Sequence, residues 1–122
     1  MAKKQEDLDA GVTRMLALAG DHDGIAFEVT RGVTRPVWEP GQPGTMALYE
    51  QARKIAGHIG FEISHGSRGG GSDGNFTGAN GHATLDGLGV EGDGLHTLNE
   101  HIDVTSLARR GRLLAGLLET LH

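Results

Sequence analysis

The chain has 122 residues, a formal net charge of −5 and no cysteine, a size that suits one domain or parts of two. The acidic balance argues against a nucleic-acid partner, which requires a basic surface, and no apolar run approaches the roughly 18 residues that cross a membrane. Without cysteine, any metal must be held by histidine and carboxylate groups, and we expect a cytoplasmic protein because no signal peptide is evident.

The first part of the chain predicts a helix followed by a strand. Apolar residues recur at helical spacing over residues 5–19, and Gly20 stands where a left-handed helix cap belongs. After a turn composition at 21–24, apolar and polar residues alternate over 25–30, which predicts a strand with one buried face. All three prolines then fall within residues 35–44, which should be extended and form the crossing between two structural units.

The next part predicts a second helix and a short strand. Apolar residues again follow helical spacing over 45–59, with Thr45 as the expected N-cap and Gly60 as the stop. Phe61–Ile63 is typical of a short strand. Residues 64–82 contain few apolar side chains, so we expect a loop with at most a short helix after Ser72.

The last part predicts one more short strand and a terminal helix. Ala83–Asp86 suits a strand, and Asp103 is expected to cap the helix that follows. Its apolar stripe is predicted to comprise Val104, Leu107, Leu114, Leu118 and Leu121, and its wet side Arg109, Arg110 and Arg112. The order of elements indicates an α/β fold, or α+β if the chain stands in isolation.

Glycine is concentrated in two loops, the first of which spans residues 68–76. Its main-chain N–H groups and the Ser72 hydroxyl could approach an anionic ligand, although a flexible surface loop is the plain alternative. The run also matches a G-x-G-x-x-G pattern. A dinucleotide fold needs a long helix there, however, and the glycines within residues 77–81 would break it.

The second loop spans residues 87–101 and contains His96 and His101. Neutral imidazole suits zinc, but a histidine in a polar loop is more often simply solvated. His101–Asp103 has the form H-x-D of a metal motif. Asp103 is better used as a helix cap, because a carboxylate that accepts hydrogen bonds from amide groups is poorly placed to ligate a metal.

A series of motifs follows in a specific order: Gly69–Asp73, Ala83–Asp86, Gly92–His96 and Asn99–Asp103, preceded by Phe27–Pro36. In order and spacing these motifs resemble those of the M20 zinc metallopeptidases and amidohydrolases, in particular the glutamate carboxypeptidase-like and acetylornithine deacetylase-related branch. The resemblance covers about residues 5 to 121. It implies that the chain is the C-terminal portion of such a protein.

The resemblance also implies a domain organisation. Residues 1–34 would be the last helix and strand of the lid or dimerisation domain, and residues 35–122 the C-terminal segment of a zinc-exopeptidase-like catalytic domain. Family enzymes hold two zinc ions and hydrolyse C-terminal peptide bonds or N-acyl amino acid amide bonds beside a free carboxylate. Their lid often mediates dimerisation, so a homo-oligomer through the lid strand is a further expectation.

Site residues carry over by position in the motifs. His96 resembles the zinc-ligating histidine of the C-terminal segment, and Arg35 resembles the arginine that meets the substrate carboxylate, an anion that a guanidinium fork suits. The other positions expected to bind substrate are Arg68, Gly70, Gly71, Ser72, Asp73, Asn75 and Gly94.

The departures from the family pattern concern the metal. The family supplies its remaining ligands and its general base from an N-terminal catalytic segment with an H-x-D motif and a Glu-Glu pair. This sequence has no Glu-Glu pair, and its only H-x-D begins at His101. A catalytic zinc needs about three protein ligands, so one histidine is too few.

We therefore expect a hydrolase fragment that is inactive alone, with weak or absent zinc binding, and that requires the missing N-terminal catalytic segment. One alternative is a non-catalytic carboxylate-binding or strand-pairing interaction module. Another is a compact enzyme in which two copies pool their histidines at an interface.

Overall fold

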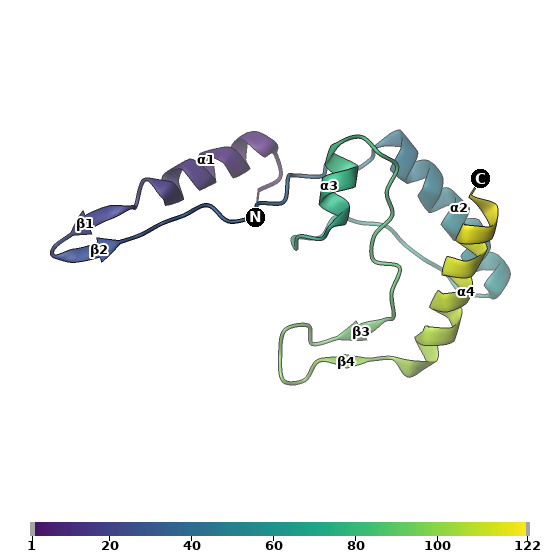
Figure 1. Cartoon of the computed structure of the whole chain (residues 1–122). Coiled ribbons are helices and arrows are strands. Elements are labelled where there is room, and N and C mark those ends of the chain that lie inside the picture. The colour runs from purple at the N-terminus through teal and green to yellow at the C-terminus, as the bar shows by residue number, and fades with distance from the viewer. Residues whose placement is uncertain (1, 122) are drawn as a thin grey trace.

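The computed structural model describes residues 2–121, which form an extended arm and a separate body (Figure 1). The arm, residues 2–34, holds helix α1 (Gln5–Leu16) and strands β1 (Gly20–His22) and β2 (Ile25–Phe27). The body holds helices α2 (Pro43–Ile59), α3 (Gly74–Ala79) and α4 (Val104–Thr120), with strands β3 (Gly92–Asp93) and β4 (His101–Ile102). Helices and short antiparallel strands are thus mixed, as the α/β expectation requires.

Helix α1 is shorter than the sequence predicts. Acidic Glu6 and Asp7 lie in its first turn and Arg14 in its last, charges that suit the two ends of the helix dipole. Ala17 is the C-cap, so the predicted extension to residue 19 is wrong. Gly20 does not cap the helix, because it has already entered β1.

The rest of the arm is a hairpin of β1 and β2. Gly20 lies opposite Phe27 and His22 opposite Ile25 in an antiparallel register. Asp23 and Gly24 make the two-residue turn with φ of 54° and 82°, left-handed values that Gly tolerates and Asp adopts more readily than most residues. The predicted strand over 25–30 with one buried face is wrong in two respects: strand β2 ends at Phe27, and its three residues are all exposed.

Helix α2 begins with proline and ends with glycine. Pro43 occupies the first turn, where its missing N–H is not needed, and Gln42 is the N-cap. The prediction of Thr45 as the cap is therefore wrong, because Thr45 already lies inside the helix. Gly60 ends the helix in the left-handed conformation with φ of 95°, and its N–H bonds to Ala56 O at 3.0 Å.

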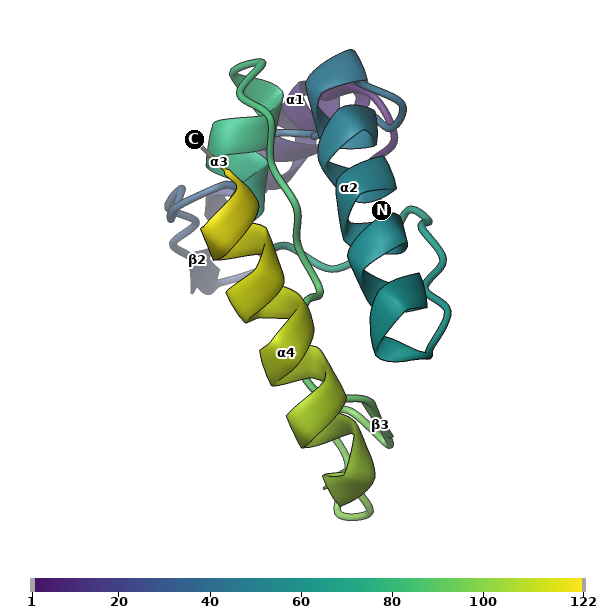
Figure 2. The same ribbon diagram turned by 90° about the vertical axis from the view of Figure 1, so that its right-hand side faces the viewer.

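Helices α2 and α4 form the core of the body. The two helices lie side by side in both views (Figures 1 and 2), and their buried hydrophobic residues are Ala52, Ala56, Leu113 and Leu117. Partly buried residues pack against this cluster: Ile55, Ile59, Phe61, Ile63, Leu85 and Leu88. Gly116 permits the close approach, since a Cβ there would lie 2.8 Å from Ile55 Cγ2.

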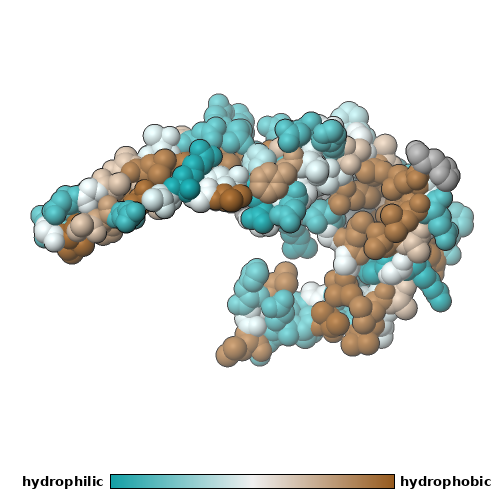
Figure 3. Space-filling model, viewed as in Figure 1, coloured by the Kyte–Doolittle hydropathy of each residue, from teal (hydrophilic) through white to brown (hydrophobic). Residues whose placement is uncertain are grey.

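The face of α4 that packs on α2 is not the predicted one. Every residue of the predicted stripe is exposed, from 45% for Leu114 to 69% for Val104 and Leu118. The predicted wet side is wrong as well for Arg109 and Arg110, which are only partly exposed. The helix carries two apolar faces, and its periodicity does not indicate which one meets α2. Figure 3 shows hydrophobic side chains gathered on the exposed surface over this end of the body.

Two segments of the body are extended but unpaired. Phe61–Ile63 and Ala83–Asp86 were predicted as strands, yet neither is one, because no backbone partner lies alongside them in the described chain. Phe61, Ile63 and Leu85 nevertheless turn toward the helices, as strand residues facing a core do. The only strand pairs within residues 2–121 are β1 with β2 and β3 with β4.

None of the helices described here combines the length and apolar character that crossing a membrane requires.

Candidate functional site

Arg35 and the glycine-rich loop meet at the junction of the arm and the body. Arg35 Nη2 lies 3.0 Å from Asp73 Oδ1, an ion pair between residues 38 positions apart. Asn75 Nδ2 donates to Pro36 O at 2.9 Å, so the backbone beside Arg35 is also fixed to the loop. Both contacts join the segment that crosses between arm and body to the residues that precede and begin α3.

The loop is shaped by short-range hydrogen bonds. Ser72 N donates to Asn75 Oδ1 at 2.9 Å, and Gly74 N donates to Ser72 Oγ at 3.1 Å. Polar side chains that bond nearby backbone groups in this way stabilise turns and helix starts. The short helix expected after Ser72 is confirmed as α3, and Asp73 precedes it without a side-chain capping bond. The Asp73 carboxylate is turned to Arg35 instead.

Trp38 anchors the crossing segment on α3. A Cβ at Gly78 would overlap with the indole ring of Trp38, and one at Gly74 would lie 3.4 Å from Trp38 Cζ3. Two glycines on α3 therefore make room for the ring, and Gly78 is buried beneath it. Sequence reasoning missed this contact. The one available signal was that the single tryptophan of the chain lies in the stretch that holds all three prolines.

The structure brings part of the predicted substrate-binding set together. Arg35, Gly71, Ser72, Asp73 and Asn75 form one cluster through the contacts above and the packing of Gly71 on the Arg35 stem. Two more members of the predicted set, Arg68 and Gly70, are exposed beside this cluster without entering it. Within the described residues, Arg68 makes neither a hydrogen bond nor an ion pair, and a Cβ at Gly70 would meet nothing within 4 Å.

The remaining predicted residues, Gly94 and His96, lie on the loop between β3 and β4. This hairpin lies apart from α3 in Figure 1, so the structure does not join His96 to the Arg35 cluster. Gly94 has φ of 71°, and a Cβ there would lie 2.7 Å from Asn99 O, so the turn requires glycine. His96 itself has φ of 64°, is exposed, and donates its backbone N–H to Glu100 Oε2 at 3.3 Å.

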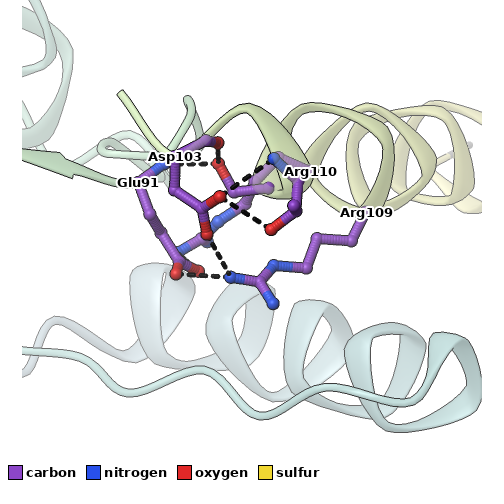
Figure 4. Close-up of polar contacts among 6 residues, drawn as sticks. Glu91, Asp103, Arg109 and Arg110 are labelled. Atoms are coloured by element: carbon purple, nitrogen blue, oxygen red, sulfur yellow. Dashed lines mark hydrogen bonds and ion pairs between the residues drawn. The ribbon is translucent and has the colours of Figure 1, made fainter. Parts of the chain in front are cut away.

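A network of charged residues fixes the base of this hairpin to α4 (Figure 4). Glu91 accepts from Arg109 Nη2 at 2.6 Å and from Arg110 Nη2 at 3.2 Å. Both guanidinium groups also lie over the Phe61 ring, 5.8 and 5.7 Å from its centroid. Local patterns did not predict this arrangement, because Glu91, the partner of Arg109 and Arg110, lies in the loop that precedes the helix.

Asp103 caps α4, as predicted. Its Oδ1 accepts from Thr105 N at 2.9 Å and from Thr105 Oγ1 at 2.7 Å. These bonds hold the pKa of Asp103 below its usual value, and the bond from the Thr105 hydroxyl has the larger effect, followed by the bond from its backbone N–H. A carboxylate committed to a helix start does not suit a metal ligand, so the H-x-D pattern at His101–Asp103 is accounted for by capping.

The described residues do not fit a catalytic zinc ion by themselves. Within residues 2–121, no group of three or more histidine, aspartate or glutamate side chains converges on one point. A catalytic zinc takes about three protein ligands and a water molecule. His96 as a ligand thus stays a prediction, and any ion at His96 would need ligands from elsewhere.

The comparisons with known proteins give one match. The model of the Peptidase family M20/M25/M40 matches residues 4–120, almost the whole chain. Neither a curated protein nor a solved structure matches at a significant level.

Proposed function

The chain belongs to peptidase family M20/M25/M40. From this membership we propose that it is a segment of a zinc-dependent hydrolase. It would catalyse hydrolysis only together with the family's N-terminal catalytic segment, called the complementing segment below. The bonds cleaved would be C-terminal peptide bonds or N-acyl amino acid amide bonds beside a free carboxylate. In this proposal, residues 1–34 are the end of the lid or dimerisation domain. Residues 35–122 are the C-terminal segment of the catalytic domain.

The observation that carries the proposal is the pair of extended segments without strand partners. Phe61, Ile63 and Leu85 pack toward the core of α2 and α4. The backbones at 62–64 and 83–86 make no hydrogen bond to another backbone group within residues 2–121. A strand at the edge of a sheet presents unpaired backbone groups on which a further strand can pair. Both segments therefore have the properties of sheet strands that lack a neighbour, which a complementing segment would supply.

The metal requirement supports the same proposal. A zinc ion, when bound, lowers the pKa of its water and so supplies a nucleophile. His96 is the one ligand that we assign to this chain, so at least two more must come from the complementing segment. The general base must come from there too. Besides His96, the chain's own contribution is to hold the substrate carboxylate.

Arg35 is the group proposed to hold that carboxylate. Its side chain is 43% exposed, and only its Nη2 is engaged by Asp73. A guanidinium has five N–H donors in a planar fork, so several remain for a second planar anion. The substrate class that follows is an N-acyl amino acid or a peptide C-terminus, each of which carries a free carboxylate.

Hydrolysis assays test the proposal. The purified chain would be incubated with zinc and a panel of N-acyl glutamates and related N-acyl amino acids, with and without the N-terminal catalytic segment of a complete family enzyme. We expect no turnover by the chain alone above that of a His96→Ala variant, and zinc-dependent turnover with the added segment that His96→Ala abolishes. Zinc-dependent turnover by the chain alone, lost in His96→Ala, would show that it assembles a full site.

A second candidate function is a non-catalytic module that binds carboxylates. The observation in its favour is that Arg35 is held by a residue of the chain itself, Asp73, at 3.0 Å. A module would bind N-acetyl-L-glutamate without zinc, and the complementing segment would add no hydrolysis. In the same module reading, the exposed hairpin of β1 and β2 would pair with strands of other copies.

A further inference from the structure

The glycine loop holds Arg35 at three points. At the head, Asp73 Oδ1 accepts from Arg35 Nη2 at 3.0 Å. Along the stem, a Cβ at Gly71 would lie 2.9 Å from Arg35 Cδ, so the bare glycine backbone packs against the aliphatic part of the side chain. At the backbone, Asn75 Nδ2 donates to the carbonyl of Pro36, the next residue after Arg35.

We propose that Gly71 and Asp73 are positioning residues, which hold the Arg35 guanidinium in one orientation for an incoming carboxylate and do not bind that carboxylate themselves. The identity of the ligand rests on the proposed function; the positioning of Arg35 does not. Both residues were predicted from the family resemblance to contact substrate directly. The contacts of the structure assign them instead to Arg35.

Geometry leaves Arg35 free to bind while it is held. Asp73 engages one nitrogen of the guanidinium, and the side chain is 43% exposed. A long arginine side chain loses several rotamers when it binds an anion. Contacts that have already removed this freedom leave less to be lost on binding, which is the general effect of preorganisation.

The negative charge of Asp73 repels the ligand carboxylate and so opposes binding, but this repulsion is weaker than the gain from orienting Arg35. The Asp73 side chain is 90% exposed, so water and salt screen its repulsion of a ligand carboxylate. An orienting role therefore predicts that removal of the Asp73 charge weakens carboxylate binding. A competing role, in which Asp73 only occupies the site, predicts that the same change tightens it.

Two neighbouring glycines provide a matched pair of variants. Gly71→Ala places a methyl group against Arg35 Cδ, whereas a Cβ at Gly70 meets nothing within 4 Å. Neither glycine has a left-handed φ, so alanine adds no backbone strain at either position. Gly71→Ala thus displaces Arg35 without a change in charge, and Gly70→Ala controls for the loss of glycine in the loop.

The first measurement needs no ligand. Nuclear spin relaxation of the Arg35 Nε–H group would be recorded in the full chain and in Asp73→Asn, Asp73→Glu, Gly71→Ala and Gly70→Ala. We expect a rigid Nε–H in the wild type and in Gly70→Ala, a mobile one in Asp73→Asn and Gly71→Ala, and partial recovery in Asp73→Glu. Unchanged backbone amide spectra would show that each variant is folded. The inference would be overturned if the Arg35 side chain were as rigid in Asp73→Asn and in Gly71→Ala as it is in the wild type.

The second measurement is binding of N-acetyl-L-glutamate and of its α-amide, which lacks only the α-carboxylate and keeps the side-chain carboxylate, followed by titration. We expect Asp73→Asn and Gly71→Ala to weaken binding of the acid by about three- to tenfold and to leave the amide unaffected. Tighter binding by Asp73→Asn, or an equal loss for both ligands, would overturn the inference. If the wild type does not prefer the acid to the amide, the proposed carboxylate role of Arg35 fails, and the relaxation measurement still decides whether Gly71 and Asp73 position it.

Discussion

At the scale of single residues, Asp103 ties the stability of α4 to pH. Hydrogen bonds from Thr105 hold the pKa of Asp103 below its usual value, which is the value expected in the unfolded chain. The stabilisation is therefore fully present above the unfolded pKa and is lost as the pH falls through the lowered folded pKa. Asp103→Asn keeps an oxygen acceptor for the cap but removes the charge. The stability difference between wild type and this variant should shrink as the pH falls from about 7 to about 3.

Chemical denaturation at several pH values measures this difference. Asp86→Asn serves as the control, because the Asp86 carboxylate bonds only the N–H of the next residue, Gly87. A stability difference for Asp103→Asn that does not change with pH would contradict the assignment of the lowered pKa to the cap.

Two adjacent leucines of α4 separate its buried face from its exposed one. Leu113 is fully buried against α2, whereas Leu114 is 45% exposed. Leu113→Ala should lower the free energy of unfolding by about 2–5 kcal/mol, the range for a leucine removed from a packed core. Leu114→Ala should lower it by less than about 1 kcal/mol. Equal losses in thermal or denaturant unfolding would mean that the Leu114 face is covered in solution.

At the scale of elements, the contact between α2 and α4 depends on one glycine. A Cβ at Gly116 would lie 2.8 Å from Ile55 Cγ2, a branched methyl group that cannot easily rotate away. Gly116→Ala should therefore push the helices apart and destabilise the chain by about 1–3 kcal/mol. Gly111 lies in the same helix with open space around it, so Gly111→Ala should stabilise the chain by up to about 1 kcal/mol. Melting temperatures that move in the same direction for both variants would refute this packing.

Elements were predictable where a few neighbouring residues determine them. Gly60 ends α2 and Asp103 begins α4 as expected, because a cap depends on groups within about one helical turn. The start of α2 was misjudged because Thr45 competes with a nearby proline, and Pro43 with its fixed φ sets the first turn. The predicted strand at Phe61–Ile63 failed for a different reason. A strand exists only with a partner, which the described chain does not provide.

For the candidate site, the sequence allowed us to predict which residues belong to it but not how they contact one another. The family resemblance named Arg35 and the glycine loop, but no local pattern could show that Arg35 meets Asp73, 38 positions later. The prediction of which face of α4 is buried was wrong for a related reason. Both of its faces are apolar, so the choice between them depends on α2, which lies far away in the sequence.

At the scale of the whole molecule, more large hydrophobic side chains are exposed than hydrophobic residues are buried in the core. Within residues 2–121, sixteen large hydrophobic side chains are exposed, whereas four hydrophobic residues are buried. Figure 3 shows such side chains both along the arm and over α4. Apolar patches of this kind favour association, with a partner segment if one is present and with other copies if none is.

We therefore expect the isolated chain to self-associate as its concentration rises. Leu118 on α4 and Ile25 on β2 are 69% and 61% exposed, and they report on the two surfaces separately. If α4 carries the contact, Leu118→Glu should lower the association measured by analytical ultracentrifugation and Ile25→Glu should not. The reverse result would favour pairing through the hairpin of β1 and β2.

A monodisperse wild-type monomer that unfolds cooperatively would count against the need for a complementing segment, because such a chain would be stable with these faces in water. Addition of the complementing segment should compete with self-association through α4 and leave association through the hairpin intact, so the two contacts can be separated in one titration.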